Sequence, residues 1–445
     1  MLSLTLARAQ QVQYPGASPA DADSPEASAT NYPAAPEFTL TNLSNAQLGP
    51  QSATGTPGTP PGAHFGGTSQ LASAPRLPAG AQPAGTTPFQ WGPIRMRPHL
   101  DYQLSYGNSL QPTPGHQVNS FVNAVSPGIL LLLGDHWSLD YTPTLRFYSD
   151  SHFQDGTDQA VILSGGTTYE AWVLGLSQSY ASTSQPLIET AAQTSQQTYS
   201  TSLNASRPLG GKLSLDLALG QDFLFLDNSV PVEGLSDSRT WSTLDWLNYQ
   251  LFPHLSAGLV LGFSYDNLSA GPDITAEQYQ GRLIWTAGQK LSLVLSGGLN
   301  DMQFLNSTSP DLLSPVFSLS AQYQLFRYTT LSLGASRSLS PAYFAGQVLE
   351  STGLNGGLSQ RLLGKLYLSV SGGYVNSSYH STVSGAAATS VSDYDTASLS
   401  VALSTTFLTR ATASVFFAQD YITSSGSSAY NYTTTESGLE LSYRY

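Results

Sequence analysis

The residues best suited to chemistry lie in one short segment, DSHFQDGTD, at residues 150–158. His152 stands among Asp150, Asp155 and Asp158, and an imidazole between carboxylates could bind a cation or form the acid–base pair of a hydrolase. The spacing does not fit a calcium-binding EF-hand loop, and a polar loop tip is the simpler interpretation. We therefore predict no metal site here.

The rest of the chain lacks the usual signatures of catalysis. It has no cysteine, which excludes a thiol nucleophile, a disulfide framework and a cysteine zinc site. It has no G-x-S-x-G motif and no phosphate-binding glycine loop, and none of its seven histidines pairs with another at metal-ligand spacing. We predict that the protein is not an enzyme and carries no cofactor.

From His99 to the C-terminus, apolar residues recur with a period of two, which predicts β-strands. These strands must position any functional side chains. In WSLDYTPTLRFY, residues 137–148, every odd position is apolar or aromatic, whereas the even positions carry hydroxyl groups, Asp140 and Arg146. Short turns alternate with longer loops rich in Ser, Asp and Gly. This is the pattern of an antiparallel up-and-down meander with two unlike ends.

We count 18 strands, with 16 as the alternative. The count includes a division between strands at 157–164 and 168–181, at the sequence SGGT. A closed antiparallel barrel with both termini on one side needs an even number of strands, which favours this division.

Two architectures accept such strands, a soluble sandwich and a membrane barrel. Charged residues are 10% of the chain, against about 25% in soluble domains. No apolar run approaches the length of a membrane helix, and the expected strands are long, with aromatic residues toward their ends. These aromatic residues could also fill a sandwich core, but the scarcity of Lys and Glu on the polar faces favours the barrel.

Residues 99–445 resemble a Gram-negative outer-membrane β-barrel of the porin-like superfamily. The final SGLELSYRY is similar to the C-terminal signal read by the barrel-insertion machinery, with Leu441, Tyr443 and Tyr445 on one face. It differs from the usual signal in ending with Tyr rather than Phe and in having Glu440 where glycine is common. The resemblance implies an all-β transmembrane barrel with periplasmic termini and short turns, long external loops, and outer-membrane lipid and lipopolysaccharide as partners.

The N-terminal part differs from the barrel in composition. Residues 1–9 end in Ala-Arg-Ala and are expected to be a residual signal peptide; the alternative is a disordered N-terminus that contains Ala-x-Ala by chance, and the sequence does not decide whether the start codon lies upstream. Residues 10–97 hold more than half of the 27 prolines and show no periodicity, so we expect a disordered linker rich in Pro, Ala, Gly and Ser. The barrel is expected at 98–445.

Charged residues divide between the two expected ends, with basic residues by the short turns and acidic residues by the long loops. The charges expected to line the lumen are Asp101, Asp140, Arg146, Lys212, Asp216, Asp222, Arg282, Glu436, Glu440 and Arg444. The residues expected to form an acidic outer mouth are Asp150, Asp155, Asp158, Glu233, Asp237, Asp273, Asp393 and Asp395. Such a mouth would favour cations and neutral solutes over anions, although these carboxylates could equally serve solubility or bind divalent ions that bridge lipopolysaccharide.

These features predict a passive porin-like channel for small hydrophilic solutes in the outer membrane. The alternatives are a polysaccharide-export barrel and a non-conducting structural or adhesive barrel. The net charge of −13 disfavours a nucleic-acid partner. The sequence assigns no transported solute and no oligomeric state.

Overall fold

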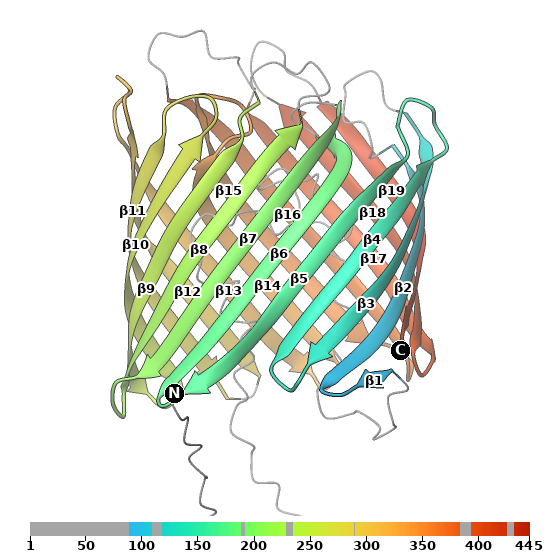
Figure 1. Cartoon of the computed structure of the whole chain (residues 1–445), viewed down its shortest axis with the longest axis horizontal. Helices are drawn as coiled ribbons and strands as arrows, with labels where there is room; N and C mark the ends of the chain where they lie inside the picture. Colours follow the sequence, from blue (N-terminus) through green and yellow to red (C-terminus); the bar gives the residue numbers. More distant parts are fainter. Residues whose placement is uncertain are drawn as a thin grey trace, which may run out of the picture. The chain divides into compact units, whose positions relative to one another are not determined.

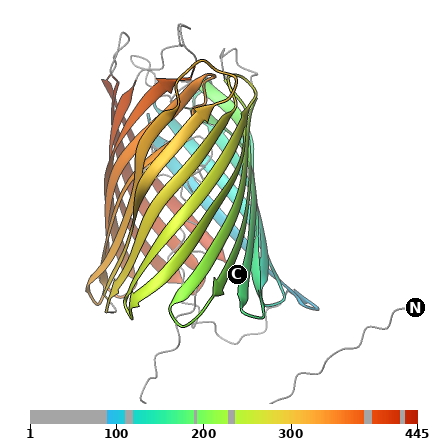
Figure 2. The ribbon, with the colours of Figure 1, turned by 90° about the vertical axis from the view of Figure 1, so that its left-hand side faces the viewer.

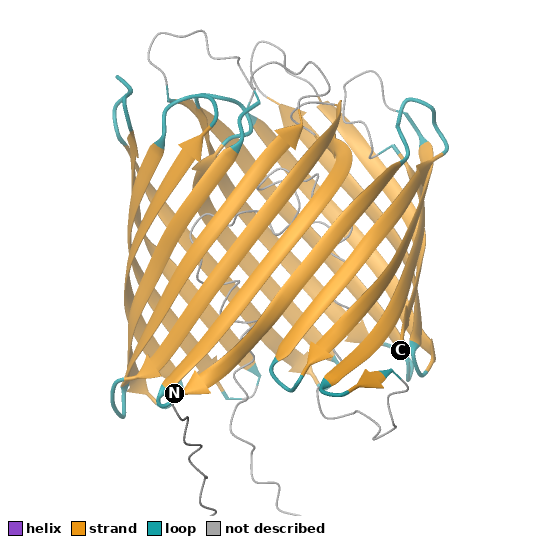
Figure 3. Cartoon of the chain, in the orientation of Figure 1, coloured by secondary structure: helices purple, strands orange, loops and turns teal. Residues whose placement is uncertain are grey.

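The computed structural model describes the following residues: 89–108, 118–187, 192–227, 235–288, 290–382, 393–424 and 431–445. Regular structure within them is entirely β (Figure 3). Across this part of the chain, no helix is long and apolar enough to cross a membrane. The expected linker before residue 89, the expected signal peptide and Glu233 lie outside the described residues.

The described residues form 19 strands in one sheet. Their bounds are β1 Gln90–Trp91, β2 Ile94–Gly107, β3 Ser120–Leu133, β4 Trp137–Tyr148, β5 Gly156–Tyr169, β6 Trp172–Leu187, β7 Ala192–Pro208, β8 Leu213–Asp227, β9 Ser238–Phe252, β10 Leu255–Leu268, β11 Ile274–Ala287, β12 Leu291–Phe304, β13 Leu312–Phe326, β14 Thr329–Pro341, β15 Gln347–Arg361, β16 Leu366–Ser381, β17 Tyr394–Leu408, β18 Ala411–Ser424 and β19 Asn431–Arg444.

The long strands close into an antiparallel barrel in which each pairs with its neighbours in sequence, and β19 returns to pair with β2 (Figures 1 and 2). The two-residue β1 pairs only with the start of β2. The predicted up-and-down barrel of 18 strands is therefore confirmed. Its first wall strand begins at Ile94, earlier than the boundary expected at residue 98.

The expected division into two strands is present, but its position at SGGT was wrong. β5 continues through Gly165 to Tyr169, and the turn to β6 follows at Glu170, which adopts a φ of 50°. Gly165 is instead a packing glycine, because a β-carbon there would lie 2.4 Å from the ring of Trp137 on β4. A glycine inside a strand often marks such a close approach rather than a turn.

The two ends of the barrel differ as predicted. At the turn end, the connections are short, for example 134–136, 253–254 and 327–328. At the loop end they are mostly longer, as at 149–155 and 305–311. The C-terminus lies at the turn end (Figure 1).

Side chains alternate between two unlike faces. On β10, Leu259 and Leu261 are 72% and 65% exposed, whereas the intervening Val260 is 3% exposed. The exposed, apolar face points outward and the other face points into the barrel. Outward aromatic residues form a belt near each end. The loop-end belt is Tyr106, Phe121, Phe147, Tyr180, Tyr199, Phe223, Trp241, Tyr265, Tyr279, Tyr374 and Tyr421. The turn-end belt is Trp137, Tyr169, Trp172, Tyr249, Trp285, Tyr323, Phe407 and Tyr443.

The seam that closes the barrel is short. β19 pairs with β2 only over Glu436–Arg444, whereas β2 pairs with β3 over its whole length. Asn108 extends the seam beyond the end of β2. Its backbone N–H donates to Thr435 O at 3.1 Å, and its side-chain oxygen accepts from Thr435 N at 2.6 Å. The amide side chain thus replaces part of the missing backbone ladder.

Candidate functional site: the inner wall and the loop-end mouth

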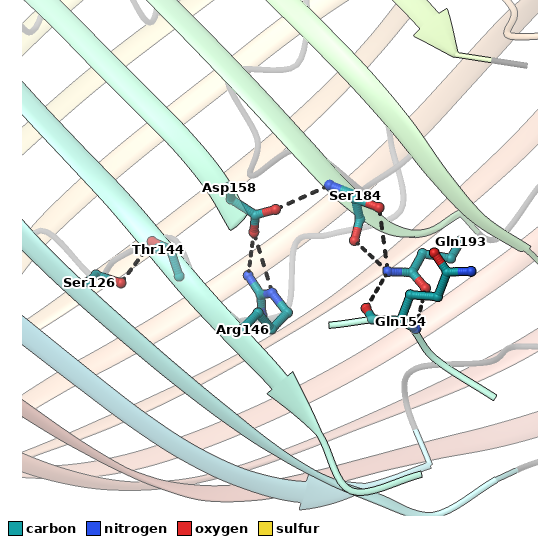
Figure 4. A network of polar contacts seen from close by, with 7 residues as sticks. All are labelled: Ser126, Thr144, Arg146, Gln154, Asp158, Ser184 and Gln193. Carbon is teal, nitrogen blue, oxygen red and sulfur yellow. Dashed lines mark hydrogen bonds and ion pairs between the residues drawn. The ribbon is translucent and has the colours of Figure 1, made fainter. Parts of the chain in front are cut away.

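Polar contacts run along the inner face of β3 to β6. Arg146 donates to Asp158 at 2.9 Å, and the other oxygen of Asp158 accepts from the backbone N–H of Ser184 at 3.1 Å (Figure 4). Ser126 and Thr144 share a hydrogen bond of 2.8 Å beside this pair. The ion pair is mostly buried, so it fixes β4, β5 and β6 together.

On the neighbouring strands β2 to β4, a glycine on β3 lets a histidine side chain from β2 reach β4 along the inner face. Gly128 on β3 is the register partner of His99 on β2, and a β-carbon at Gly128 would lie 2.1 Å from His99 Nε2. The imidazole reaches β4, where it bonds Thr142 Oγ1 at 3.0 Å and lies 3.8 Å from Asp140. Thr142 in turn donates to Asp140 at 2.8 Å.

The wall from β8 to β11 repeats this arrangement with an arginine. Arg282 on β11 donates to Asp216 on β8 at 3.2 Å and to Asn248 on β9. Its guanidinium also lies 4.1 Å from the centre of the Trp246 ring. Arg282 and Trp246 are 6% and 1% exposed, so this is a buried charge that is paired, hydrogen-bonded and stacked.

Carboxylates gather on the remaining inner wall. Asp101, Glu436 and Glu440 lie on β2 and β19, and Asp420 lies on β18. Asp101 accepts from Ser442 across the closing seam, and Glu440 accepts from Ser414 at 3.3 Å.

A second acidic row crosses β8, β9 and β10. Asp222 and Asp266 are both register partners of Thr240, which donates to Asp266.

The structure places nine of the ten residues expected to line the lumen on inward positions of the strands. These are Asp101, Asp140, Arg146, Asp216, Asp222, Arg282, Glu436, Glu440 and Arg444. Lys212 is a correction. β8 begins only at Leu213, after Gly210 and Gly211, so Lys212 lies exposed in the turn and is not part of the wall.

The mouth contains a feature that the sequence did not reveal, an inward hairpin formed by residues 337–350. The ladder between β13 and β14 ends at Phe317 and Arg337, but β14 and β15 remain paired up to Pro341 and Val348. β15 also stays paired with β16 up to Gln347 and Ser381, so β14 parts from β13 while it remains joined to β15 and β16. Leu339 and Val348 are both fully buried in a cluster with side chains from the inner face. These inner-face partners are Leu268, Ile274, Ala276, Met302, Phe304 and Val316.

Polar contacts also hold the inward hairpin against β13. Arg337 forms an ion pair with Glu350 at 2.8 Å, and Glu350 also accepts from Ser314 Oγ at 3.3 Å. His380 Nε2 lies 3.7 Å from the same carboxylate. Ser314 is an inward residue of β13 and is 3% exposed, so the hairpin covers the inside of the wall.

The tip of the inward hairpin reaches other connections. Phe344 pairs with Leu235, and Ser236 N donates to Tyr343 O at 2.9 Å, both in the connection from β8 to β9. On the other side, Thr382 N donates to Gly346 O at 2.8 Å. The Thr382–Gly346 bond continues the ladder between β15 and β16, so the tip extends from these strands to the β8–β9 connection.

The expected acidic mouth residues mostly cap strand ends. Backbone N–H groups that leave the ladder at a strand end need another acceptor. Carboxylates supply it in five places: Asp155 to Tyr148, Asp158 to Ser184, Asp237 to Leu226, Asp273 to Leu268 and Asp393 to Tyr379. Asp150 accepts from the His152 N–H inside the loop at 149–155. Asp395 instead accepts from Tyr374 and Asn376, each at 2.8 Å.

The segment DSHFQDGTD is thus not drawn together into one site. Asp150 bonds the backbone and the ring of His152, while Asp155 and Asp158 turn to other partners. The hydrogen bonds from the His152 backbone and then its ring lower the pKa of Asp150 below its ordinary value of 3.8. Among the described residues, no group of three or more His, Asp or Glu is arranged to hold a metal ion.

The C-terminal residues expected to form the insertion signal lie at the closing seam. Leu441 and Tyr443 point outward and are 38% and 43% exposed. The ring of Tyr445 lies 4.0 Å from the Arg410 guanidinium, and its backbone N–H donates to Pro98 O at 3.1 Å.

Comparison with known proteins adds the fold alone. No protein-family model and no curated protein matches the chain. Among solved structures, it resembles OccAB4 of Acinetobacter baumannii at 13% identity and a TM-score of 0.44, covering 80% of this chain and 99% of that one. OpdO of Pseudomonas aeruginosa gives 12% identity and a TM-score of 0.44, covering 79% and 97%. A bacterial polysaccharide outer membrane secretin gives 9% and 0.34, covering 78% and 98%. At these scores, none of them argues for a function.

The barrel's own features are more informative. It has 18 long antiparallel strands, an apolar outer face with two aromatic belts, a polar inner face, and connections that alternate in length. These are the features of a porin-like barrel of the outer-membrane type.

Proposed function

We propose that the chain is an outer-membrane channel through which small hydrophilic solutes diffuse passively, with cations favoured over anions. The turn end and the N-terminus face the periplasm in this proposal, and the loop end faces outward. Lipopolysaccharide and the barrel-insertion machinery are the expected partners, as for other barrels with this asymmetry of turns and loops.

The distribution of charge on the inner wall carries the proposal. Nine carboxylates point inward: Asp101, Asp140, Asp158, Asp216, Asp222, Asp266, Asp420, Glu436 and Glu440. Six guanidinium groups also stand at inward positions: Arg146 and Arg282 form ion pairs with carboxylates of this wall, and Arg95, Arg97, Arg361 and Arg444 lie near the turn end. A wall of one dominant sign concentrates counter-ions in the lumen.

The inward hairpin supports a limit on solute size. It covers the inner face of β10 to β13 and reaches the connection from β8 to β9. Part of the inner wall remains accessible, because the inward-facing Ile162 on β5 is 48% exposed. A narrowed mouth above an accessible wall suits small solutes better than a polymer.

Single-channel recording tests the proposal. The full chain, refolded in a planar bilayer, should give ohmic steps with a cation-selective reversal potential under a KCl gradient. The variant Asp420→Asn/Glu436→Gln/Glu440→Gln should lower the ratio of cation to anion permeability about twofold or more. Asp135→Asn is the matched control, because this carboxylate lies at the turn end with its side chain 88% exposed.

The other outcomes decide against parts of the proposal. Anion selectivity in the unmodified channel would contradict the argument from charge but would still support an open pore. A correctly folded, heat-modifiable barrel without conductance would instead support a non-conducting structural barrel or an exporter that needs a partner to open.

A further inference from the structure

The ladder between β3 and β4 is broken in the middle of the wall. Pairing stops after Val125 and resumes at Ile129 in the same register, so Pro127 on β3 faces Pro143 on β4. Neither proline has a backbone N–H, so neither can donate across the ladder. The ladders that join β3 to β2 and β4 to β5 continue past both prolines. The break is therefore confined to one pair of strands.

Both prolines lie on the outer face, between the two aromatic belts. Pro143 is four residues from Phe147 in the loop-end belt and six from Trp137 in the turn-end belt. Pro127 is exposed and follows Phe121 of the loop-end belt by six residues. Because hydrocarbon offers no hydrogen bonds, main-chain carbonyl groups along the break need a donor from another source.

Side chains hold the break together on its inner face. Ser126 and Thr144 face each other across it and share the hydrogen bond of 2.8 Å (Figure 4). Gly128 has no side chain, and the imidazole of His99 lies over it and bonds Thr142 Oγ1 at 3.0 Å. Side-chain contacts of this kind rearrange faster than the main chain. β3 and β4 can therefore part here without breaking a main-chain hydrogen bond between them.

A hydrogen-bonding side chain stands directly outside the break. Gln159 on β5 is the register partner of Pro143, points outward and is exposed. Its amide takes part in no hydrogen bond among the described residues, and an amide without a partner is costly on a lipid face. Around it the outer face is apolar, with Leu100 and Leu145 45% and 41% exposed. The break thus has polar groups on both of its sides.

We propose that β3 and β4 part locally at this break and let small uncharged molecules pass sideways from the lumen into the lipid. The molecules suited to this route have an apolar body and one hydrogen-bonding group. That group bonds Thr142 or Thr144 on the inner side, then a free carbonyl of the break, then the Gln159 amide. The apolar body is drawn onto the outer face by the hydrophobic effect. A charged solute does not follow, because lipid excludes it.

The route rests on the open lumen proposed above, because the molecules reach the break from inside the barrel. The side chain of Asp140, beside His99, is 34% exposed, so solutes can approach this part of the inner wall. Ions move along the barrel axis and do not cross the break. Conductance and sideways passage can therefore be lost separately.

Dye uptake tests the route. N-phenyl-α-naphthylamine is an uncharged aromatic amine with one N–H, and it fluoresces once it has entered lipid. In cells that express the full chain with Ser126→Cys and Thr144→Cys, oxidation should lower dye uptake to the rate of cells without the chain. A reductant should restore it, and the chain has no cysteine of its own to interfere.

The matched control is Ser138→Cys with Ser164→Cys. These two serines also point inward and face each other, and they share a hydrogen bond of 3.0 Å, but they lie across the unbroken ladder between β4 and β5. Oxidation of this pair should leave dye uptake unchanged. Equal loss of uptake in both pairs would overturn the route, because any stiffening of the wall would then suffice.

Single-channel conductance of the same variants separates the route from the pore. Conductance should be equal before and after oxidation. A conducting channel that takes up dye equally with and without the bridge between residues 126 and 144 would overturn the route and leave the pore. A folded chain with neither conductance nor dye uptake would overturn both.

Completing the ladder gives a second measurement that needs no disulfide. Pro127→Val with Pro143→Val restores both N–H groups and should lower dye uptake. Pro315→Val is the control, because Pro315 on β13 also points outward, opposite Leu299, and lies far from the break. Unchanged uptake in the folded double variant would overturn the route.

Discussion

Gly258 on β10 is the direct register partner of Arg282 on β11, and the arginine crosses β10 at this glycine to reach Asp216 on β8. Asn248 stands on the other side of the same glycine and bonds both of these charged groups. The absence of one side chain thus allows a polar network to span four strands.

Replacing Gly258 by alanine should break this network. A β-carbon there would lie 2.5 Å from Asn248 Oδ1, so the amide must move away from Arg282. We expect a loss of about 1–3 kcal/mol in the free energy of unfolding, measured by urea titration of the refolded barrel. Gly281→Ala is the control, since a β-carbon at that position meets nothing within 4 Å. Equal losses of unfolding free energy in the two variants would show that the cost comes from the backbone freedom of glycine and not from the contact with Asn248.

The ion pair between Arg146 and Asp158 should contribute strongly to the free energy of unfolding. Removing one partner leaves a mostly buried charge and a lost acceptor for Ser184 N, so Asp158→Ala should cost about 3–5 kcal/mol. The double variant with Arg146→Ala should cost less than the sum of the single losses. A double-mutant cycle on the unfolding free energy measures this coupling. Strict additivity would mean that the two groups do not interact.

The inward hairpin should control conductance. Truncating Leu339 and Val348 to alanine removes buried contacts worth about 2–5 kcal/mol for the leucine alone. We expect the hairpin to leave the inner wall and the single-channel conductance to rise. Leu333→Ala is the control, because this residue of β14 faces outward and is 47% exposed. Unchanged conductance in a folded channel would show that the hairpin does not limit the pore.

The loop at residues 149–155 should respond to acid. The hydrogen bonds from His152 hold the pKa of Asp150 below its ordinary value of 3.8. A lowered pKa means that the contact contributes above that value and is lost as the pH falls through the lowered pKa. Exchange of the His152 amide proton should therefore accelerate only below about pH 4. In Asp150→Ala, which removes the acceptor, exchange should be fast at every pH. Unchanged exchange would show that the carboxylate does not hold this loop.

Much of the barrel follows from local sequence because alternation is a local property. The residues of WSLDYTPTLRFY divide between the two faces as their polarity predicts, with Tyr141 40% exposed on the outside and Asp140 beside His99 on the inside. The inner placement of Arg282 follows in the same way. Its route across Gly258 to Asp216 does not, because that depends on the register of four strands.

The inward hairpin could not be read from alternation. Leu339 and Val348 continue the outward period of β14 and β15, and only the end of the ladder at Arg337 turns that face toward the inner wall. One local sign was present. Pro315 on β13 lies just beyond this end, and a proline without an N–H is tolerated where a strand edge has no partner.

The short closing seam affects where the barrel first opens in the bilayer. Its pairing covers Glu436–Arg444 only, and beyond Gly107 the side chain of Asn108 takes the place of the absent strand. With fewer main-chain links to break than at the neighbouring ladders, amide protons here should be among the first in the wall to exchange with deuterium. The folded barrel would then open first between β2 and β19, its first and last long strands.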